Sequence, residues 1–96
     1  MRDISNILDE IVRICVKDGN INKVILYGSR AKGTNMERSD IDIALKGSDL
    51  NIELINDEID EIETLLKIDL VDIENCNNEL LKKEVEDYGV TLYSEV

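Results

Sequence analysis

The sequence predicts a small α/β or α+β domain in which a short β-sheet is flanked by helices. Stretches with the apolar periodicity of helices alternate along the chain with short apolar or alternating stretches typical of strands. The chain has 96 residues, which suits one domain spanning 1–96 and is too short for two. A domain of this size builds one modest core, so we do not expect a deep cleft between two lobes.

The first element is an amphipathic helix of about four turns near the N-terminus. Its apolar positions are Ile4, Ile7, Leu8, Ile11, Val12 and Cys15. Asp3 or Ser5 can cap the start of this helix, and Gly19 lies where the helix should stop. Because Cys15 shares the apolar face, we expect its thiol to be buried in the core.

Two strands are expected next. Residues 24–27 form a short apolar run rich in strand-forming residues and closed by a glycine, which indicates a buried strand. A polar and basic segment spans residues 28–39. Residues 40–45 then alternate, which predicts a strand with one buried face. The positions expected on the other face are Asp40, Asp42 and Ala44. Residues 46–49 are typical of a turn and a helix cap.

A second amphipathic helix is expected over residues 50–66. Its apolar positions are Leu50, Leu54, Ile55, Ile59, Ile62 and Leu66. The other face carries Glu53, Asp57, Glu58, Asp60, Glu61 and Glu63. Such an acidic run is usually a solvated helix face, and the alternative is a docking surface for a basic partner.

Three further elements complete the chain. Residues 68–73 alternate again and predict a third strand, with Asp69 on one face and Asp72 on the other. A short helix has its apolar positions at Leu80, Leu81 and Val85. This helix should end at Gly89, and residues 90–93 should form a final extended piece.

Composition and charge exclude several classes of function. The net charge is −11, with 22 acidic and 11 basic residues, which argues against direct binding of DNA or RNA. A small anionic ligand is compatible with this charge if metal ions supply positive charge, and a basic protein partner is compatible with it as well. The chain has no His and two distant cysteines, which argues against a zinc site. It has no signal-peptide core and no apolar stretch of about 20 residues, so we expect a cytoplasmic protein without membrane contact.

Asp40 and Asp42 are the first candidates for chemistry. On a strand, both carboxylates of an Asp-x-Asp sequence project from the same face, with Cα atoms about 7 Å apart. Two such carboxylates repel each other unless a cation lies between them, and Mg²⁺ prefers oxygen ligands of this kind. In a chain with 34% charged residues, the pattern alone would favour an exposed strand face without a ligand.

Gly28 and Ser29 follow the first strand and are candidates for phosphate binding. Glycine lets the backbone approach a phosphate, and the amides and the Ser29 hydroxyl can donate to its oxygens. The basic side chains of Arg30, Lys32 and Arg38 could pair with a triphosphate. A P-loop is excluded because no Gly-Lys-Ser/Thr occurs. Alone, a Gly-Ser after a strand is usually a turn.

The two features together form one signature, Gly28-Ser29, ten residues, then Asp40-Ile41-Asp42. It closely resembles the signature of the DNA polymerase β-like nucleotidyltransferase superfamily, which implies a small mixed sheet flanked by helices. The segments Gly-Ser-Arg-Ala-Lys-Gly and Ser-Asp-Ile-Asp-Ile are most similar to those of the minimal stand-alone branch, the MNT proteins, which are often encoded beside a HEPN-domain toxin. Residues 68–72 and 88–93 also resemble that branch, so the resemblance covers nearly the whole chain.

The resemblance implies roles for individual residues. Gly28-Ser29 would bind phosphate, and Asp40 and Asp42 would hold two Mg²⁺ ions. Asp69 would be the third carboxylate of the site, assisting the attacking hydroxyl, and Asp72 is its rival for that role. Because strand alternation places Asp69 and Asp72 on opposite faces, only one of them can face the metal ions.

The resemblance also implies a reaction. MNT antitoxins of this branch transfer AMP from ATP to a tyrosine of the partner HEPN toxin, an RNase, and so silence it, and some form hetero-oligomers with the toxin. Two other functions stay open. The chain could be a binding module that neutralises its partner by contact, or a nucleotidyltransferase acting on a small molecule or an RNA end. The net charge and the lack of an acceptor domain weigh against the last of these.

Overall fold

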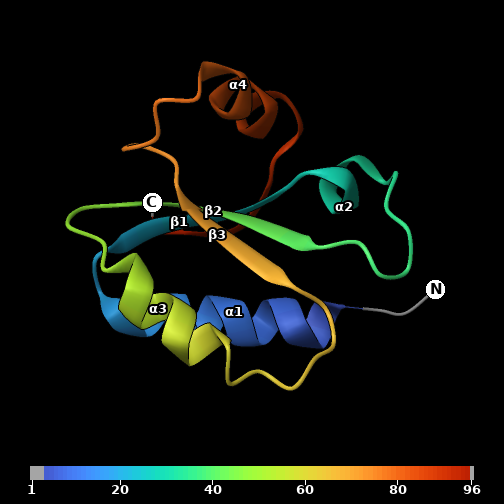
Figure 1. The fold of residues 1–96 in the computed structure, drawn as a ribbon. Helices are drawn as coiled ribbons and strands as arrows, with labels where there is room; N and C mark the ends of the chain where they lie inside the picture. Colours follow the sequence, from blue (N-terminus) through green and yellow to red (C-terminus); the bar gives the residue numbers. More distant parts are fainter. Residues whose placement is uncertain (1–3, 96) are drawn as a thin grey trace.

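The fold is a four-stranded mixed β-sheet with helices on both faces (Figure 1). A computed structural model describes residues 4–95, and it confirms the predicted fold class. The elements along the chain are α1 (Ser5–Asp18), β1 (Ile21–Tyr27), α2 (Ser29–Lys32), β2 (Ile41–Gly47), α3 (Ile52–Ile59), β3 (Ile68–Asp72), α4 (Glu79–Tyr88) and β4 (Val90–Ser94). The strand order is β3-β2-β1-β4. Strand β1 pairs antiparallel with β2 and β4, and β2 pairs parallel with β3.

The main core lies between the sheet and the helices α1 and α3, which cover the lower face in Figure 1. Its buried members are Ile11, Cys15, Ile21, Val24, Leu26, Ile41, Ile43, Leu45, Ile55 and Ile59. Each buried aliphatic side chain contributes about 1.5–3 kcal/mol relative to an exposed one. The predicted burial of Cys15 is confirmed, and burial raises the pKa of its thiol to about 12. That thiol therefore stays protonated and unreactive.

A second, smaller core lies on the opposite face, beneath α4. Its buried members are Ile25, Ala44, Ile73 and Val85. The expectation that β2 has only one buried face is therefore wrong for its middle, where Ala44 is fully buried. Helix α4 packs over this part of the sheet, whereas Asp42, two residues earlier on the same face, stays half-buried. This face is thus apolar beneath α4 and polar beyond it.

The N-terminal cap of α1 differs from the prediction. The capping position is Ile4, without a side-chain hydrogen bond, and Ser5 is already the first helical residue. The expectation of a Ser5 cap is therefore wrong, and the alternative, Asp3, lies outside the described residues. The predicted end at Gly19 is confirmed, with a left-handed φ of 80° and its amide donating to the Val16 carbonyl at 3.3 Å.

The cap of α3 also lies elsewhere than expected. Asn51 accepts a hydrogen bond from the Leu54 amide at 3.1 Å, so Asn51 and not residues 46–49 caps this helix. Lys46 and Gly47 instead continue β2, because they pair with the beginning of β1. The extra pairing also explains why β1 begins earlier than its apolar run.

Helix α3 is much shorter than the predicted 50–66. It ends at Ile59, and residues 60–67 form a loop. The last turn carries Asp57 and Glu58 without a basic residue, and the C-terminal end of a helix dipole disfavours negative charge. Extending the helix through Glu61 would add repulsion between acidic side chains four residues apart. The apolar periodicity continues past the point where electrostatics stops the helix.

The C-terminal elements follow the prediction. Helix α4 is capped by Asn78, whose side chain accepts from the Leu81 amide at 3.1 Å, and it ends before Gly89. The final extended piece is an edge strand, β4, paired with β1. Across residues 4–95, no helix combines the length and apolar character needed to cross a membrane.

Candidate active site

The ends of three neighbouring strands, β1, β2 and β3, lie together at one end of the sheet. Because β2 runs antiparallel to β1 and parallel to β3, the end of β1 lies beside the beginnings of β2 and β3. Tyr27 pairs with Asp42, and Asp42 pairs with Asp69. Directly paired residues of neighbouring strands project from the same face, with strands about 4.8 Å apart. The two aspartates therefore lie side by side on the face of the sheet that carries α4, in the part that α4 does not cover.

The register separates the two rivals for the third carboxylate. Asp69 is the direct neighbour of Asp42, whereas Asp72 pairs with Leu45 three positions further along the ladder. Asp72 also accepts a hydrogen bond from the Asn75 side chain at 2.8 Å. The structure brings Asp69 to the Gly-Ser motif and leaves Asp72 at the opposite end of β3.

Asp40 lies just outside the sheet. Strand β2 begins at Ile41, whose amide donates to the Lys67 carbonyl at 2.8 Å, so Asp40 precedes the ladder and is exposed. The expectation that it belongs to the strand is wrong. Within residues 4–95, no three acidic or thiol side chains are grouped closely enough to hold a metal ion by themselves. Mg²⁺ in proteins commonly takes one or two carboxylates and completes its shell with phosphate oxygens and water, which this arrangement fits.

Negative charge accumulates around Asp42. Partial burial raises the pKa of the Asp42 carboxyl, and the charges of Asp69, Asp40 and Glu84 raise it further. Lys67 opposes this effect and lies with its Nζ 3.6 Å from Oδ1 of Asp69. Lys67 pairs with Asp69 and Lys32 pairs with Glu84, so two lysines face four carboxylates, and a divalent cation would neutralise the remaining negative charge.

Gly28 lies directly against this carboxylate. Its φ is 77°, in the left-handed region that favours glycine, and a Cβ at this position would collide with Oδ2 of Asp42. Helix α2 begins at the next residue, and the amides of Ala31 and Lys32 both donate to the Gly28 carbonyl at 3.1 Å. The first two amides of α2, beginning with that of Ser29, precede these helical bonds. The backbone of Gly28 and the carboxylate of Asp42 are therefore in direct contact.

The three basic residues of the motif do not all point to the region between Gly28 and Asp42. Arg30 Nε donates to the Ser39 carbonyl and its Nη2 to the Glu37 carbonyl, both at 3.0 Å. These bonds fix the loop that leads to Asp40. Arg38 is exposed and lines a separate 170 Å³ hollow with apolar residues of the 60–67 loop. Arg30 is therefore engaged in holding the loop, and Arg38 faces another surface.

Lys32 is engaged across the molecule, by a residue that the sequence did not single out. Its Nζ lies 2.7 Å from Oε1 of Glu84, on α4. No sequence pattern could have indicated Glu84, because the packing of α4 alone brings it here. Lys67 was not predicted either, although its position in the sequence gave an indication. It lies two positions before Asp69, and strand alternation places both on one face.

Tyr27 closes the row of side chains. Burial raises the pKa of its phenol to about 12, and the charges of Asp42, Asp69, Glu84 and Cys76 contribute in that order. The phenol therefore stays protonated at neutral pH. A protonated hydroxyl among carboxylates can donate a hydrogen bond and adds no charge to the site.

Comparisons with known proteins agree with this geometry. Residues 9–96 match the family model described as "Polymerase beta, Nucleotidyltransferase". A protein of Methanocaldococcus jannaschii named "Putative protein adenylyltransferase MJ1379" is 29% identical over 92 residues, which are 91% of this chain and 92% of that protein.

Two solved structures extend the comparison. A chain in a crystal structure of a toxin-antitoxin with AMP-PNP is 26% identical, with a TM-score of 0.68 over 91% of this chain and 73% of its own length. A chain in the structure of a tri-AMPylated HEPN toxin of Shewanella oneidensis in complex with an MNT antitoxin shares the fold. It is 21% identical, with a TM-score of 0.66 over 96% of this chain and 73% of its own length. The chain belongs to the polymerase β-type nucleotidyltransferase family.

Proposed function

We propose that this chain is a protein adenylyltransferase that transfers AMP from ATP to a tyrosine hydroxyl of a partner HEPN toxin and so acts as its antitoxin. The observation that carries the proposal is the pairing of Asp42 with Asp69 beside the left-handed backbone of Gly28. The relative named as a protein adenylyltransferase and the toxin-antitoxin structure with AMP-PNP support the same reaction and the same kind of partner.

Each residue of the site has a place in this proposal. Asp40, Asp42 and Asp69 would hold Mg²⁺, with the triphosphate supplying further oxygens. Bound Mg²⁺ would offset the charge of the triphosphate and ease departure of pyrophosphate. The backbone of Gly28 and the hydroxyl of Ser29 would hold the phosphates. Among the basic residues, Lys32 would contact the triphosphate, whereas the bonds of Arg30 make it a support of the loop.

The chemical step follows from these positions. The tyrosine oxygen of the acceptor attacks the α-phosphorus, the bond from that phosphorus to the bridging oxygen breaks, and pyrophosphate leaves. Asp69 takes the phenolic proton. In this proposal, the partner presents its own hydroxyl to the site.

A labelling experiment tests the proposal. The purified chain is incubated with its HEPN partner and Mg²⁺, in parallel with ATP labelled at the α-phosphate and ATP labelled at the γ-phosphate. We expect the α-label on a tyrosine of the partner and no γ-label. Transfer of the γ-label would indicate a kinase. If no label reaches the partner with Mg²⁺ or Mn²⁺, the protein is not an adenylyltransferase for that partner.

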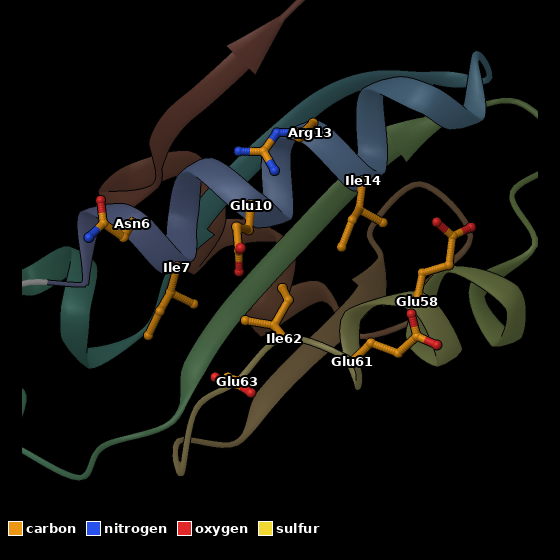
Figure 2. A pocket seen from close by; sticks show the side chains of 9 residues that line it. All are labelled: Asn6, Ile7, Glu10, Arg13, Ile14, Glu58, Glu61, Ile62 and Glu63. Atoms are coloured by element: carbon orange, nitrogen blue, oxygen red, sulfur yellow. The ribbon is translucent and has the colours of Figure 1, made fainter.

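A groove on the far face of the sheet favours a second candidate, neutralisation of the partner by contact. It lies between α1 and the segment around the end of α3, with a volume of 610 Å³. Figure 2 shows Ile7, Ile14 and Ile62 pointing into it. The charged residues around it are Glu10, Arg13, Glu58, Glu61 and Glu63. This charge complements a basic amphipathic segment of a partner protein, which would bury its apolar side chains on the isoleucines.

Charge reversal distinguishes the two candidates. If the chain neutralises the toxin by contact alone, we expect the double variant Glu61→Lys/Glu63→Lys to bind the toxin at least about tenfold more weakly, because two attractive charges become repulsive. Glu53→Lys is the matched control, since it lies on α3 outside the groove. Binding is measured by titration calorimetry and neutralisation by toxin RNase activity. Contact as the mechanism is excluded if the reversed variant still neutralises the toxin while Asp42→Asn does not.

A further inference from the structure

The ion pair between Lys32 and Glu84 connects the Gly-Ser motif to α4. Its atoms lie 2.7 Å apart, and about one third of each side chain is exposed, 34% for Lys32 and 32% for Glu84. The Lys32 ammonium also lies 5.2 Å from the centre of the Tyr88 ring. The hydrogen bond to Glu84 raises the pKa of Lys32, so this cation is present throughout the neutral range.

The pair stands beside the carboxylates of the active site. Val85, the residue after Glu84, packs with Ile25 and Ala44, and Tyr27 packs against the same cluster. The charge of Glu84 contributes to the raised pKa values of both Asp42 and Tyr27. Lys32 is three residues after Ser29, on the single turn of α2 that begins at the motif. A triphosphate held at Gly28-Ser29 would therefore compete with Glu84 for the ammonium of Lys32.

We propose that Lys32 exchanges partners when nucleotide binds, leaving Glu84 for the triphosphate, and that Glu84 thereby sets the affinity for Mg-ATP. The inference rests on the proposed function, because it requires a triphosphate at Gly28-Ser29. Both partners of Lys32 are anionic oxygens, so the exchange replaces one charge-assisted hydrogen bond by another. Glu84 acts as a positioning residue, since it governs where the cation lies without touching the nucleotide.

A double-mutant cycle tests the exchange. Mg-ATP is titrated into wild type, Glu84→Gln, Lys32→Met and the double variant, with the chain alone and in complex with its partner. We expect Glu84→Gln to bind about 2–5-fold more tightly, because a partly exposed ion pair no longer has to break. We expect Lys32→Met to bind more weakly, and the double variant to match Lys32→Met. Methionine keeps a side chain of similar length over Tyr88.

Glu86→Gln is the matched control, since Glu86 lies on the same helix and is exposed. It removes the same charge and should leave the affinity near that of wild type. Equal tightening by Glu84→Gln with and without Lys32 would overturn the exchange, because Glu84 would then act only by repelling the nucleotide. Weaker binding by Glu84→Gln would overturn it too. Wild type that fails to bind Mg-ATP in either form contradicts the proposed function as well, whereas binding without coupling contradicts the exchange alone.

Discussion

Replacing Asp42 by Asn is expected to slow AMP transfer by at least about 10³-fold, or about 4 kcal/mol in activation free energy. Asparagine keeps the shape of the side chain and removes the charge that a metal ion requires. Asp42 is the central member of the site, because it pairs with Tyr27 on one side and with Asp69 on the other. No neighbouring carboxylate occupies an equivalent position on β2.

The same substitution should stabilise the metal-free protein. The pKa of Asp42 is raised in the folded state, so the folded chain binds this proton more tightly than the unfolded chain does. The resulting stability is present below the unfolded pKa of about 3.9 and is lost as the pH rises through the raised folded pKa. At pH 7 the ionised carboxylate is therefore destabilising. Since solvent still reaches the half-buried carboxyl, we expect Asp42→Asn to gain less than about 1 kcal/mol, or a few degrees in Tm.

Transfer and the response to Mg-ATP are measured with Asp57→Asn as the control, and the stability of the metal-free protein is compared with wild type. Asp57 is exposed on α3 and undergoes the same change of charge far from the motif. Transfer is followed with α-labelled ATP, and melting is recorded with and without Mg-ATP. Mg-ATP should raise the Tm of wild type and of Asp57→Asn, and leave that of Asp42→Asn unchanged. An Asp42→Asn protein that still transfers AMP, or that melts below wild type without metal, would contradict the proposed role of Asp42.

Replacing Gly28 by Ala should cost both stability and nucleotide binding. A φ of 77° disfavours alanine by about 1–3 kcal/mol. The added methyl group would also collide with Oδ2 of Asp42, which must move away. We expect a fall in Tm of roughly 10 °C, since each kcal/mol corresponds to about 4–8 °C in a domain of this size. Displacing Asp42 should remove Mg-ATP binding, measured by titration calorimetry.

Gly33 offers a control with a similar φ and a different ψ, which is 15° at Gly33 and −157° at Gly28. Its φ is 78°, but a Cβ there would have no atom within 4 Å. Gly33→Ala therefore carries the penalty of a left-handed backbone without a collision, and it should keep Mg-ATP binding. The loss of stability in Gly28→Ala combines its own backbone penalty with the collision, so Mg-ATP binding is the readout that reports on the contact between residue 28 and Asp42. Normal Mg-ATP binding by Gly28→Ala would show that this close approach has no role.

The family signature and most of the elements were predictable from local sequence. The apolar positions of α1 and α4 recur at helical spacing, and the glycines that end these helices lie where expected. The apolar pattern of residues 50–66 continues beyond Ile59, where α3 ends. The acidic side chains in and after the last turn disfavour a longer helix, and a hydrophobic pattern does not contain this electrostatic effect.

By itself, the sequence determined which residues belong to the Gly-Ser and Asp-x-Asp signature and which faces of α1 and α4 are apolar, because spacing along one chain segment sets both. Only the tertiary structure placed Asp69 beside Asp42 and Asp72 three positions further along the ladder, since these positions depend on the register of β3 against β2. It also decided the partner of Lys32, because Glu84 reaches the site only when α4 packs on the sheet. Register and helix docking join residues distant in sequence, and no local pattern encodes such contacts.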